Sequence, residues 1–159
     1  MKVAVVGTGT AGILSISFLL AYSPEPIQVY SIHNPKKPIL GIGESTSTQI
    51  PGVLYDCIGF TLLENSNELD ATAKLGVKFS NWREKEFYSH IMPVCYGMHF
   101  DNHSIKEFSF KKFRELYKNF REIHGDVTSI ESKGTKAYVT VDGKQNSFDY
   151  VIDLSLIHI

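Results

Sequence analysis

Three short segments of the chain carry the residue types best suited to chemistry. Residues 7–12 read Gly-Thr-Gly-Thr-Ala-Gly, which has the G-x-G-x-x-G spacing of loops that hold the pyrophosphate of a dinucleotide. Residues 41–46 read Gly-Ile-Gly-Glu-Ser-Thr, and their glycines and small hydroxyl residues predict a backbone that can lie close to a ligand. Lys74 opens the third segment, Lys-Leu-Gly-Val-Lys-Phe-Ser-Asn-Trp at residues 74–82. The first segment predicts a cofactor, and the third predicts a site that uses it.

The glycine motif predicts a specific way of binding. Gly7 permits a tight turn, Gly9 lets the backbone approach a pyrophosphate, and Gly12 allows the following helix to pack closely on the strand. Thr10 and Ala11 begin that helix, whose free N–H groups and dipole favour anions. A structural glycine turn is the alternative. The apolar run before the motif and the helical stretch after it favour dinucleotide binding.

The ribose contact of such a site is missing in its usual form. The second strand of a dinucleotide-binding fold normally ends in Asp or Glu, which binds the ribose hydroxyls. Ser31 stands near that position here, and Glu25 comes too early in the chain. We therefore expect a weaker ribose contact from the Ser31 hydroxyl.

The elements around the first two segments follow from hydrophobic patterning. The apolar run at residues 3–6 predicts a strand buried on both faces of a parallel sheet. A helix is expected from about residue 11 to residue 22, and a second strand at residues 27–30. Together they predict a βαβ start, whose connection is right-handed in nearly all known folds.

Lys74 lies in a stretch that has the period of a strand. Between residues 73 and 82, Leu75, Val77 and Phe79 alternate with lysines and a glycine, which predicts one strand with a buried apolar face. Lys74 lies on the opposite face of this predicted strand. On periodicity alone, it is an ordinary solvated lysine.

The rest of the chain predicts further helices and a group of antiparallel strands. An aromatic stripe at residues 110–120 predicts a helix that Gly125 closes. Weaker helical patterns lie at residues 47–54, interrupted by Pro51-Gly52, and at residues 60–71. Strands are expected at residues 127–131, 137–141 and 148–152. The predicted fold class is α/β, a Rossmann-like parallel sheet with a βαβ start and an antiparallel strand insertion.

Composition excludes several classes of function. With 159 residues, 43% of them hydrophobic, and a formal net charge of −1, the chain predicts one globular domain without the clustered cations that bind nucleic acid. Glycines break the apolar N-terminus, so no membrane span is expected. Cys57 and Cys95, in apolar contexts without a nearby second thiol or a secretory signal, predict a reduced, cytoplasmic setting. His90, His99 and His103 lack the spacing and the carboxylate partner of a metal site, so no metal is expected.

The three segments, in this order and at about this spacing, resemble the flavin-dependent tryptophan halogenase family. Residues 74–82 discriminate this family from general flavin monooxygenases, which share the glycine motif and the strand at residues 151–153. Those enzymes lack a lysine-bearing strand that ends in Asn-Trp. The resemblance covers residues 1–153 and matches the N-terminal part of a full-length family member.

The resemblance implies FAD as the cofactor, bound at the glycine loop and at a second loop that includes Gly43, Glu44, Ser45 and Thr46. A plain surface turn is the alternative for that second loop. A separate flavin reductase is implied as the source of reduced FAD, which with oxygen converts chloride or bromide to hypohalous acid. Lys74 matches the lysine that receives this acid from an internal tunnel, beside tryptophan, an indole or another aromatic substrate. Either a haloamine or a hydrogen-bonded acid is compatible with a buried amine there.

The resemblance also implies parts that these residues do not contain. The family's downstream glutamate and its Trp-x-Trp-x-Ile-Pro motif do not occur in the sequence, so we expect a partial, truncated FAD-binding domain at residues 1–153 that is inactive alone. Residues 154–159 read as a non-native tail, with Leu156 close to where a glycine should approach the flavin; an ordinary apolar C-terminus is the alternative. Two competing functions are another FAD-dependent monooxygenase or oxidoreductase and a non-catalytic flavin-binding fragment.

Overall fold

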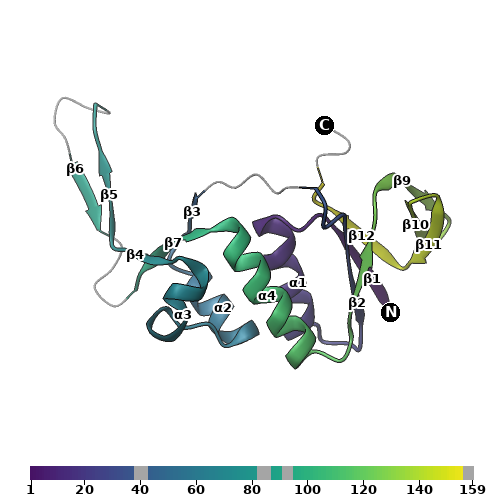
Figure 1. The fold of residues 1–159 in the computed structure, drawn as a ribbon, viewed down its shortest axis with the longest axis horizontal. Coiled ribbons are helices and arrows are strands. Elements are labelled where there is room, and N and C mark those ends of the chain that lie inside the picture. The colour runs from purple at the N-terminus through teal and green to yellow at the C-terminus, as the bar shows by residue number, and fades with distance from the viewer. Residues whose placement is uncertain (38–42, 82–86, 91–94, 156–159) are drawn as a thin grey trace.

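A four-stranded parallel sheet forms the centre of the molecule. The computed structural model describes residues 1–37, 43–81, 87–90 and 95–155. The sheet has the order β12-β1-β2-β8, and all its neighbouring strands run parallel. Its strands are β1 (Lys2–Val6), β2 (Gln28–His33), β8 (Phe120–His124) and β12 (Tyr150–Asp153). Helix α1 (Thr10–Tyr22) connects β1 to β2, so the predicted α/β class and βαβ start are confirmed (Figure 1).

Both faces of the parallel sheet are buried, which explains the continuous apolar run of its first strand. Val3 and Val5 belong to the core that the sheet forms with α1 and α4 (Asn102–Leu116). Ala4 and Val6 belong to a second core on the other side. Because Val3, Val5 and Val6 are at most 4% exposed, burial of each contributes roughly 1.5–3 kcal/mol relative to an exposed side chain.

A three-stranded antiparallel sheet supplies that second core and confirms the predicted strand insertion. Its order is β11-β10-β9, with β9 (Val127–Lys133), β10 (Lys136–Val141) and β11 (Lys144–Phe148). Asp142 and Gly143 join β10 to β11 with positive φ angles of 45° and 77°, as a tight hairpin turn requires. The expected strand at residues 148–152 is in fact two, because Phe148 pairs with Ala137 in this sheet and Tyr150 pairs with Val3 in the parallel one.

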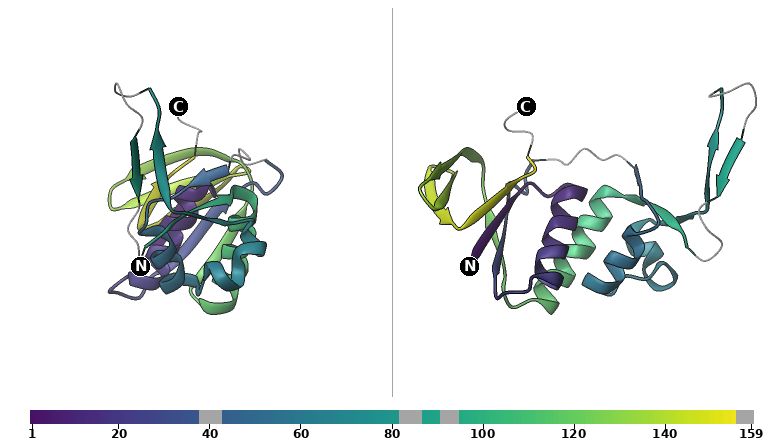
Figure 2. Two further views of the ribbon diagram at one scale, coloured as in Figure 1. Left: turned by 90° about the vertical axis from the view of Figure 1, so that its left-hand side faces the viewer. Right: turned by 180° about the vertical axis from the view of Figure 1, so that it is seen from behind.

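The middle of the chain forms a separate small layer beside α1 and α4. It contains α2 (Ile50–Ile58), α3 (Leu62–Leu69) and a sheet of order β3-β7-β4, from β3 (Gly43–Ser45), β7 (Gly97–Asp101) and β4 (Thr72–Lys74). Strands β5 (Gly76–Phe79) and β6 (Phe87–His90) pair with each other and project away from the rest of the molecule (Figure 2).

The segment from residue 73 to residue 82 is not the single strand that its periodicity predicts. The chain changes sheet at Leu75, because β4 pairs with β7 and β5 pairs with β6. Leu75 is 66% exposed rather than buried, whereas Val77 and Phe79 are half-buried. Alternation identifies strand residues, but it does not say which partner each strand joins. Trp82 lies outside the described residues.

The helix predicted at residues 110–120 lies earlier in the chain. It begins at Asn102 because the Asp101 carboxylate accepts a hydrogen bond of 2.8 Å from the Ser104 N–H and caps it. Phe120 is the first residue of β8, so Gly125 follows a strand rather than a helix. The Phe113 and Phe120 rings nevertheless pack together, with centroids 5.3 Å apart. The aromatic stripe in the sequence therefore combines core residues of two successive elements, α4 and β8.

The weaker helical patterns also have shifted limits. Pro51 lies in the first turn of α2, where the missing N–H is not needed, and the helix continues through Gly52. Helix α3 is shorter than residues 60–71, because Thr61 caps its start. Cys57 is buried, whereas Cys95 is exposed. Within the part of the chain that the structure describes, no helix combines the length and apolarity needed to cross a bilayer.

Candidate functional site

The first predicted segment lies at the carboxyl edge of the parallel sheet, between β1 and α1. The Gly7 N–H donates to the Ile32 carbonyl at 3.0 Å, and Gly7 has a φ of +101°. A Cβ at Gly7 would lie 2.8 Å from the Leu154 carbonyl oxygen, which follows β12. Both the backbone angle and this close approach exclude a side chain at Gly7.

Gly12 is closely packed, whereas Gly9 has room for a side chain. A Cβ at Gly12 would lie 2.2 Å from the Gly7 carbonyl oxygen, so the first turn of α1 can touch the loop because Gly12 has no side chain. At Gly9, the residue before α1, a Cβ would meet no described atom within 4 Å. Gly9 caps α1 without a side-chain hydrogen bond, and Ala11 is exposed in the first turn. The N-terminal N–H groups of α1 therefore have no side-chain cap from Gly9, and such free groups at a helix start favour an anion.

The second predicted segment is tied to this helix end through Glu44. The Thr10 hydroxyl donates to Glu44 Oε1 at 2.7 Å, and the Asn102 amide donates to the same oxygen at 2.6 Å. Thr10 begins α1 and Asn102 begins α4, so one carboxylate joins the starts of two helices to β3. Gly43 pairs with Asp101 in the neighbouring strand, which continues the same connection.

The third predicted segment meets the second at Lys74. The Lys74 ammonium donates to the Ser45 hydroxyl at 2.8 Å and to the Thr46 carbonyl at 3.3 Å. Thr46 is buried and is fixed by two bonds of 2.9 Å to Met98, one from its own N–H and one accepted by its hydroxyl. Lys74 is a half-buried residue, and its amine is therefore held against a segment that is itself bonded to β7.

These bonds place the three segments in one arrangement. A Cβ at Gly97 would lie 2.7 Å from the Thr46 carbonyl oxygen, so the glycine lets β7 pass close beneath the loop that holds Lys74. From α1, the contacts run through Glu44 to Ser45 and on to the amine. The arrangement offers uncapped N–H groups for an anion and a positioned amine beside the same loop.

Ser31 does not join this arrangement. Strand β2 extends to His33, so Ser31 lies inside the strand rather than at its end and is fully buried. Its hydroxyl is 3.5 Å from His33 Nδ1. The sequence pattern ended the second strand too early, since the polar residues after Tyr30 do not look like strand residues.

Two residues with functional geometry were missed by sequence reasoning. Asn102 Oδ1 is buried and has no hydrogen-bond partner among the described residues, although its amide binds Glu44. His33 ends β2, and burial, with Lys106 as the next cause, lowers its pKa to about 4. The pair Asp101-Asn102 before a helical pattern was a usable helix-start signal. Nothing in a single sequence indicated the environment of His33.

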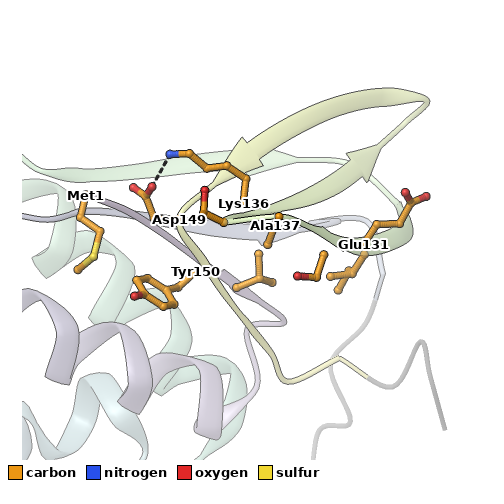
Figure 3. Close-up of a pocket in the computed structure, with 11 residues that line it drawn as sticks. Met1, Glu131, Lys136, Ala137, Asp149 and Tyr150 are labelled. Atoms are coloured by element: carbon orange, nitrogen blue, oxygen red, sulfur yellow. Dashed lines mark hydrogen bonds and ion pairs between the residues drawn. The ribbon is translucent and has the colours of Figure 1, made fainter.

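A separate cavity lies outside the three predicted segments. It has a volume of about 840 Å³ and lies between the antiparallel sheet and the edge of β12 (Figure 3). Lys136 forms an ion pair with Asp149 at its rim, and this hydrogen bond lowers the pKa of the Asp149 carboxyl. Its lining contains none of the predicted site residues. Across residues 1–37, 43–81, 87–90 and 95–155, no group of three or more His, Cys, Asp or Glu could hold a metal ion.

Comparison with known families gives a match to the tryptophan halogenase model over residues 2–93. Tryptophan 7-halogenase RebH of Lentzea aerocolonigenes is 33% identical over 82 residues, which are 52% of this chain and 16% of that protein. Tryptophan 6-halogenase ThaL of Streptomyces albogriseolus is 31% identical over 81 residues, or 51% of this chain and 15% of that protein.

Solved structures that include two halogenases and one further FAD-bound protein share the fold. An enzyme from Xanthomonas campestris superimposes with a TM-score of 0.81 at 15% identity, over 97% of this chain and 42% of that one. The tryptophan halogenase of Shewanella frigidimarina gives 0.79 at 14% identity, over 98% and 42%. CtdE, solved in complex with FAD, gives 0.69 at 20% identity, over 100% and 38%. The chain thus spans less than half the length of each of these proteins.

Proposed function

Because the chain belongs to the tryptophan halogenase family, we propose that it forms the flavin-binding and lysine-bearing part of an FAD-dependent halogenase. The substrate is tryptophan, an indole or another electron-rich aromatic, and the halide is chloride or bromide. A separate flavin reductase supplies the reduced cofactor. The observation that carries the proposal is the continuous set of contacts from the α1 N-terminus through Glu44 and Ser45 to the Lys74 amine.

The glycine loop fits the pyrophosphate of FAD. Gly12 lets the first turn of α1 approach the loop, and the open space beside Gly9 admits a phosphate to the uncapped N–H groups. The Thr10 hydroxyl is engaged by Glu44, so backbone N–H groups rather than this side chain hold the anion. When bound, reduced FAD with oxygen supplies the oxidising equivalents that convert halide to hypohalous acid.

Lys74 receives that acid and presents the halogen to the aromatic ring. An ammonium has three N–H donors, and two of those at Lys74 are used by Ser45 and Thr46. The third donates to the oxygen of hypohalous acid. As the halogen passes to a ring carbon and the O–halogen bond breaks, that oxygen takes the lysine proton and leaves as water, and the ring proton returns to the amine through a base. In the haloamine alternative, the neutral amine forms the N–halogen bond while the O–halogen bond breaks and water leaves. The halogen then passes to the ring, and the amine regains a proton.

The loop beneath Lys74 supports either role by fixing the amine. Two hydrogen bonds to Met98 hold Thr46 in place, and they therefore fix the position of the Thr46 carbonyl that accepts from Lys74. A reacting group held in one geometry avoids the entropic cost of bringing it to the substrate. Ser45 and Thr46 are therefore positioning residues, and Lys74 is the catalytic one.

The test uses a chimera, because the chain spans less than half the length of its relatives. Residues 1–153 replace the matching segment of the Xanthomonas campestris enzyme, and the product is assayed with FAD, a flavin reductase, halide and indole by mass spectrometry. We expect a halogenated indole, and we expect Lys74→Met to lower turnover by about 10³-fold or more while FAD binding is unchanged, as for loss of a group that acts in the transition state. Lys78→Met is the matched control and should retain turnover.

Three outcomes would contradict the proposal. Equal turnover in the Lys74→Met and Lys78→Met chimeras would remove Lys74 from the reaction. Hydroxylated rather than halogenated product would favour another FAD-dependent monooxygenase. If the chimera and the isolated chain both bind FAD stoichiometrically but the chimera makes no product, a non-catalytic flavin-binding role would be favoured.

A further inference from the structure

The small sheet of order β3-β7-β4 has one face in the core and one face outside it. Met98 and Phe100 of β7 belong to the hydrophobic core, so the residues that alternate with them along β7 point to the other side. We call this other side the open face. Its residues are Ser45 of β3, Thr72 and Lys74 of β4, and Gly97, His99 and Asp101 of β7.

Lys74 crosses the open face from β4 to β3. Its partner in β7 is Gly97, and a Cβ at Gly97 would lie 3.5 Å from Lys74 Cδ. The lysine stem therefore passes over β7 at a position without a side chain, and the amine reaches the Ser45 hydroxyl on the far strand at 2.8 Å. The next residue of β7 on this face is His99, which pairs with the same Ser45.

His99 thus lies between the two strands that the lysine connects. It pairs with Ser45 on one side and with Thr72 on the other, and side chains paired in this way have Cβ atoms about 4.5–5.5 Å apart. Lys74 follows Thr72 by two residues, which makes it the diagonal neighbour of His99 and within reach of a long side chain. Ser45, Thr72 and His99 are all exposed, so a substrate placed over the amine also meets the imidazole.

The reaction proposed for Lys74 needs a group that moves one more proton. Halogen transfer leaves a ring carbon bonded to both the halogen and its own proton, and that proton must leave. The Asp101 carboxylate already accepts from the Ser104 N–H at 2.8 Å and from the Ser104 hydroxyl at 2.9 Å, and these bonds lower its pKa. Asp101 is therefore a weak base. An imidazole is the side chain best suited to accept and return a proton near neutral pH.

We infer that His99 is the base that removes the ring proton and returns it to Lys74, an inference that rests on the halogenase function proposed above. The imidazole nitrogen forms an N–H bond while the ring C–H bond breaks, and the electron pair of that bond restores the aromatic ring. The imidazolium then gives its proton to the neutral Lys74 amine through the Ser45 hydroxyl. One hypohalous acid and one ring C–H bond thus give one carbon–halogen bond and one water. The ring loses the same proton in the haloamine alternative.

The test uses the chimera that carries residues 1–153, with FAD, a flavin reductase, halide and either ordinary indole or indole deuterated at its ring carbons. His99→Gln keeps a polar side chain in β7 but cannot take up a proton. We expect kcat to fall about 100-fold, as for the loss of a general base, with FAD binding and KM for indole unchanged. Proton removal then limits the rate, so deuterium should slow the variant more than it slows the wild-type chimera.

Two further variants separate proton transfer from a structural role. Thr72→Val is the matched control, because it changes the other cross-strand neighbour of His99 without removing a titratable group. It should retain turnover and show the same response to deuterium as the wild-type chimera. In His99→Ala, the space left by the ring admits a free base, so added imidazole should restore turnover in proportion to its concentration.

Several outcomes overturn the inference. His99→Gln could retain turnover, or it could raise KM without lowering kcat, which would place His99 in substrate binding. A loss of FAD binding, or a loss of turnover that responds neither to deuterium nor to added imidazole, would assign His99 a structural role. Lys74-dependent halogenation that His99→Gln leaves intact would reject this inference alone, whereas a wild-type chimera without halogenated product would reject the proposed function as well.

Discussion

The glycine loop at α1 and the lysine at the end of β4 differ in how far along the chain their supporting contacts reach. Gly12 packs against Gly7, five positions away. Lys74 is held by Ser45, 29 positions away, and Glu44 joins Thr10 and Asn102 over 34 and 58 positions. The loop is therefore specified by the local βαβ unit, whereas the lysine depends on strands that meet only in the folded molecule. Substitutions in the loop should act by steric clash, and those around the lysine by lost hydrogen bonds.

The largest effect is expected from Gly12→Ala. Its Cβ would lie 2.2 Å from the Gly7 carbonyl oxygen, and moving that backbone should cost about 2–4 kcal/mol in the free energy of unfolding and abolish FAD binding. Urea denaturation measures the first and flavin fluorescence the second. Gly52→Ala is the control, because its Cβ in α2 meets no described atom within 4 Å, and it should stabilise by about 0.5–1 kcal/mol. If both glycines tolerate alanine equally, local sterics do not specify the loop.

The second-largest effect is expected from Glu44→Ala, which tests the contacts between residues that are distant in the sequence. Removing the carboxylate leaves the buried Asn102 amide and the Thr10 hydroxyl without their shared acceptor, which should cost about 1–3 kcal/mol in the free energy of unfolding. Glu44→Gln keeps an amide oxygen in the same place and should retain most of the stability. Urea denaturation of both variants decides. Equal losses would mean that the charge of Glu44, rather than its accepting oxygen, joins the two helices.

The same contrast explains what the sequence could predict. The glycine motif, the βαβ start and the antiparallel strands were readable because each depends on neighbouring residues. The split of residues 73–82 at Leu75 was not, because the chain changes partner strand there and periodicity carries no information on partners. Nor could a sequence show that Ser31 lies inside β2, since the strand's length is set by pairing with β8 up to His33 and His124.

The third prediction concerns His33. This residue ends β2 of the βαβ unit, but its surroundings include Phe110 and Lys106 of α4, which lie far along the chain. Its pKa is lowered from 6.5 to about 4 in the folded chain, so between these values the unfolded chain binds more protons. Stability is therefore lost as the pH falls from 6.5 to 4 and restored as it rises. The loss should be about 1–2 kcal/mol, discounted from the full shift because the ring is partly exposed. His33→Phe, which keeps a ring against Phe110, should flatten this part of the pH–stability curve in urea titrations. An unchanged slope would show that His33 is not the titrating group.

The smallest effect is expected from Ser45→Ala. This variant tests whether the contacts around Lys74 orient the amine or mainly stabilise the fold. The hydroxyl is exposed and accepts one bond from Lys74, so its loss should cost no more than about 0.5–1 kcal/mol in the free energy of unfolding. The amine keeps the Thr46 carbonyl but gains freedom to rotate. In the chimera, kcat should therefore fall by about 3- to 10-fold with KM for indole unchanged, since an interaction that orients the amine acts in the transition state. Ser47→Ala, two residues along, is the control and should leave kcat unchanged. A rise in KM without a fall in kcat would place Ser45 in substrate binding, and the lysine would then be positioned by Thr46 and β7 alone.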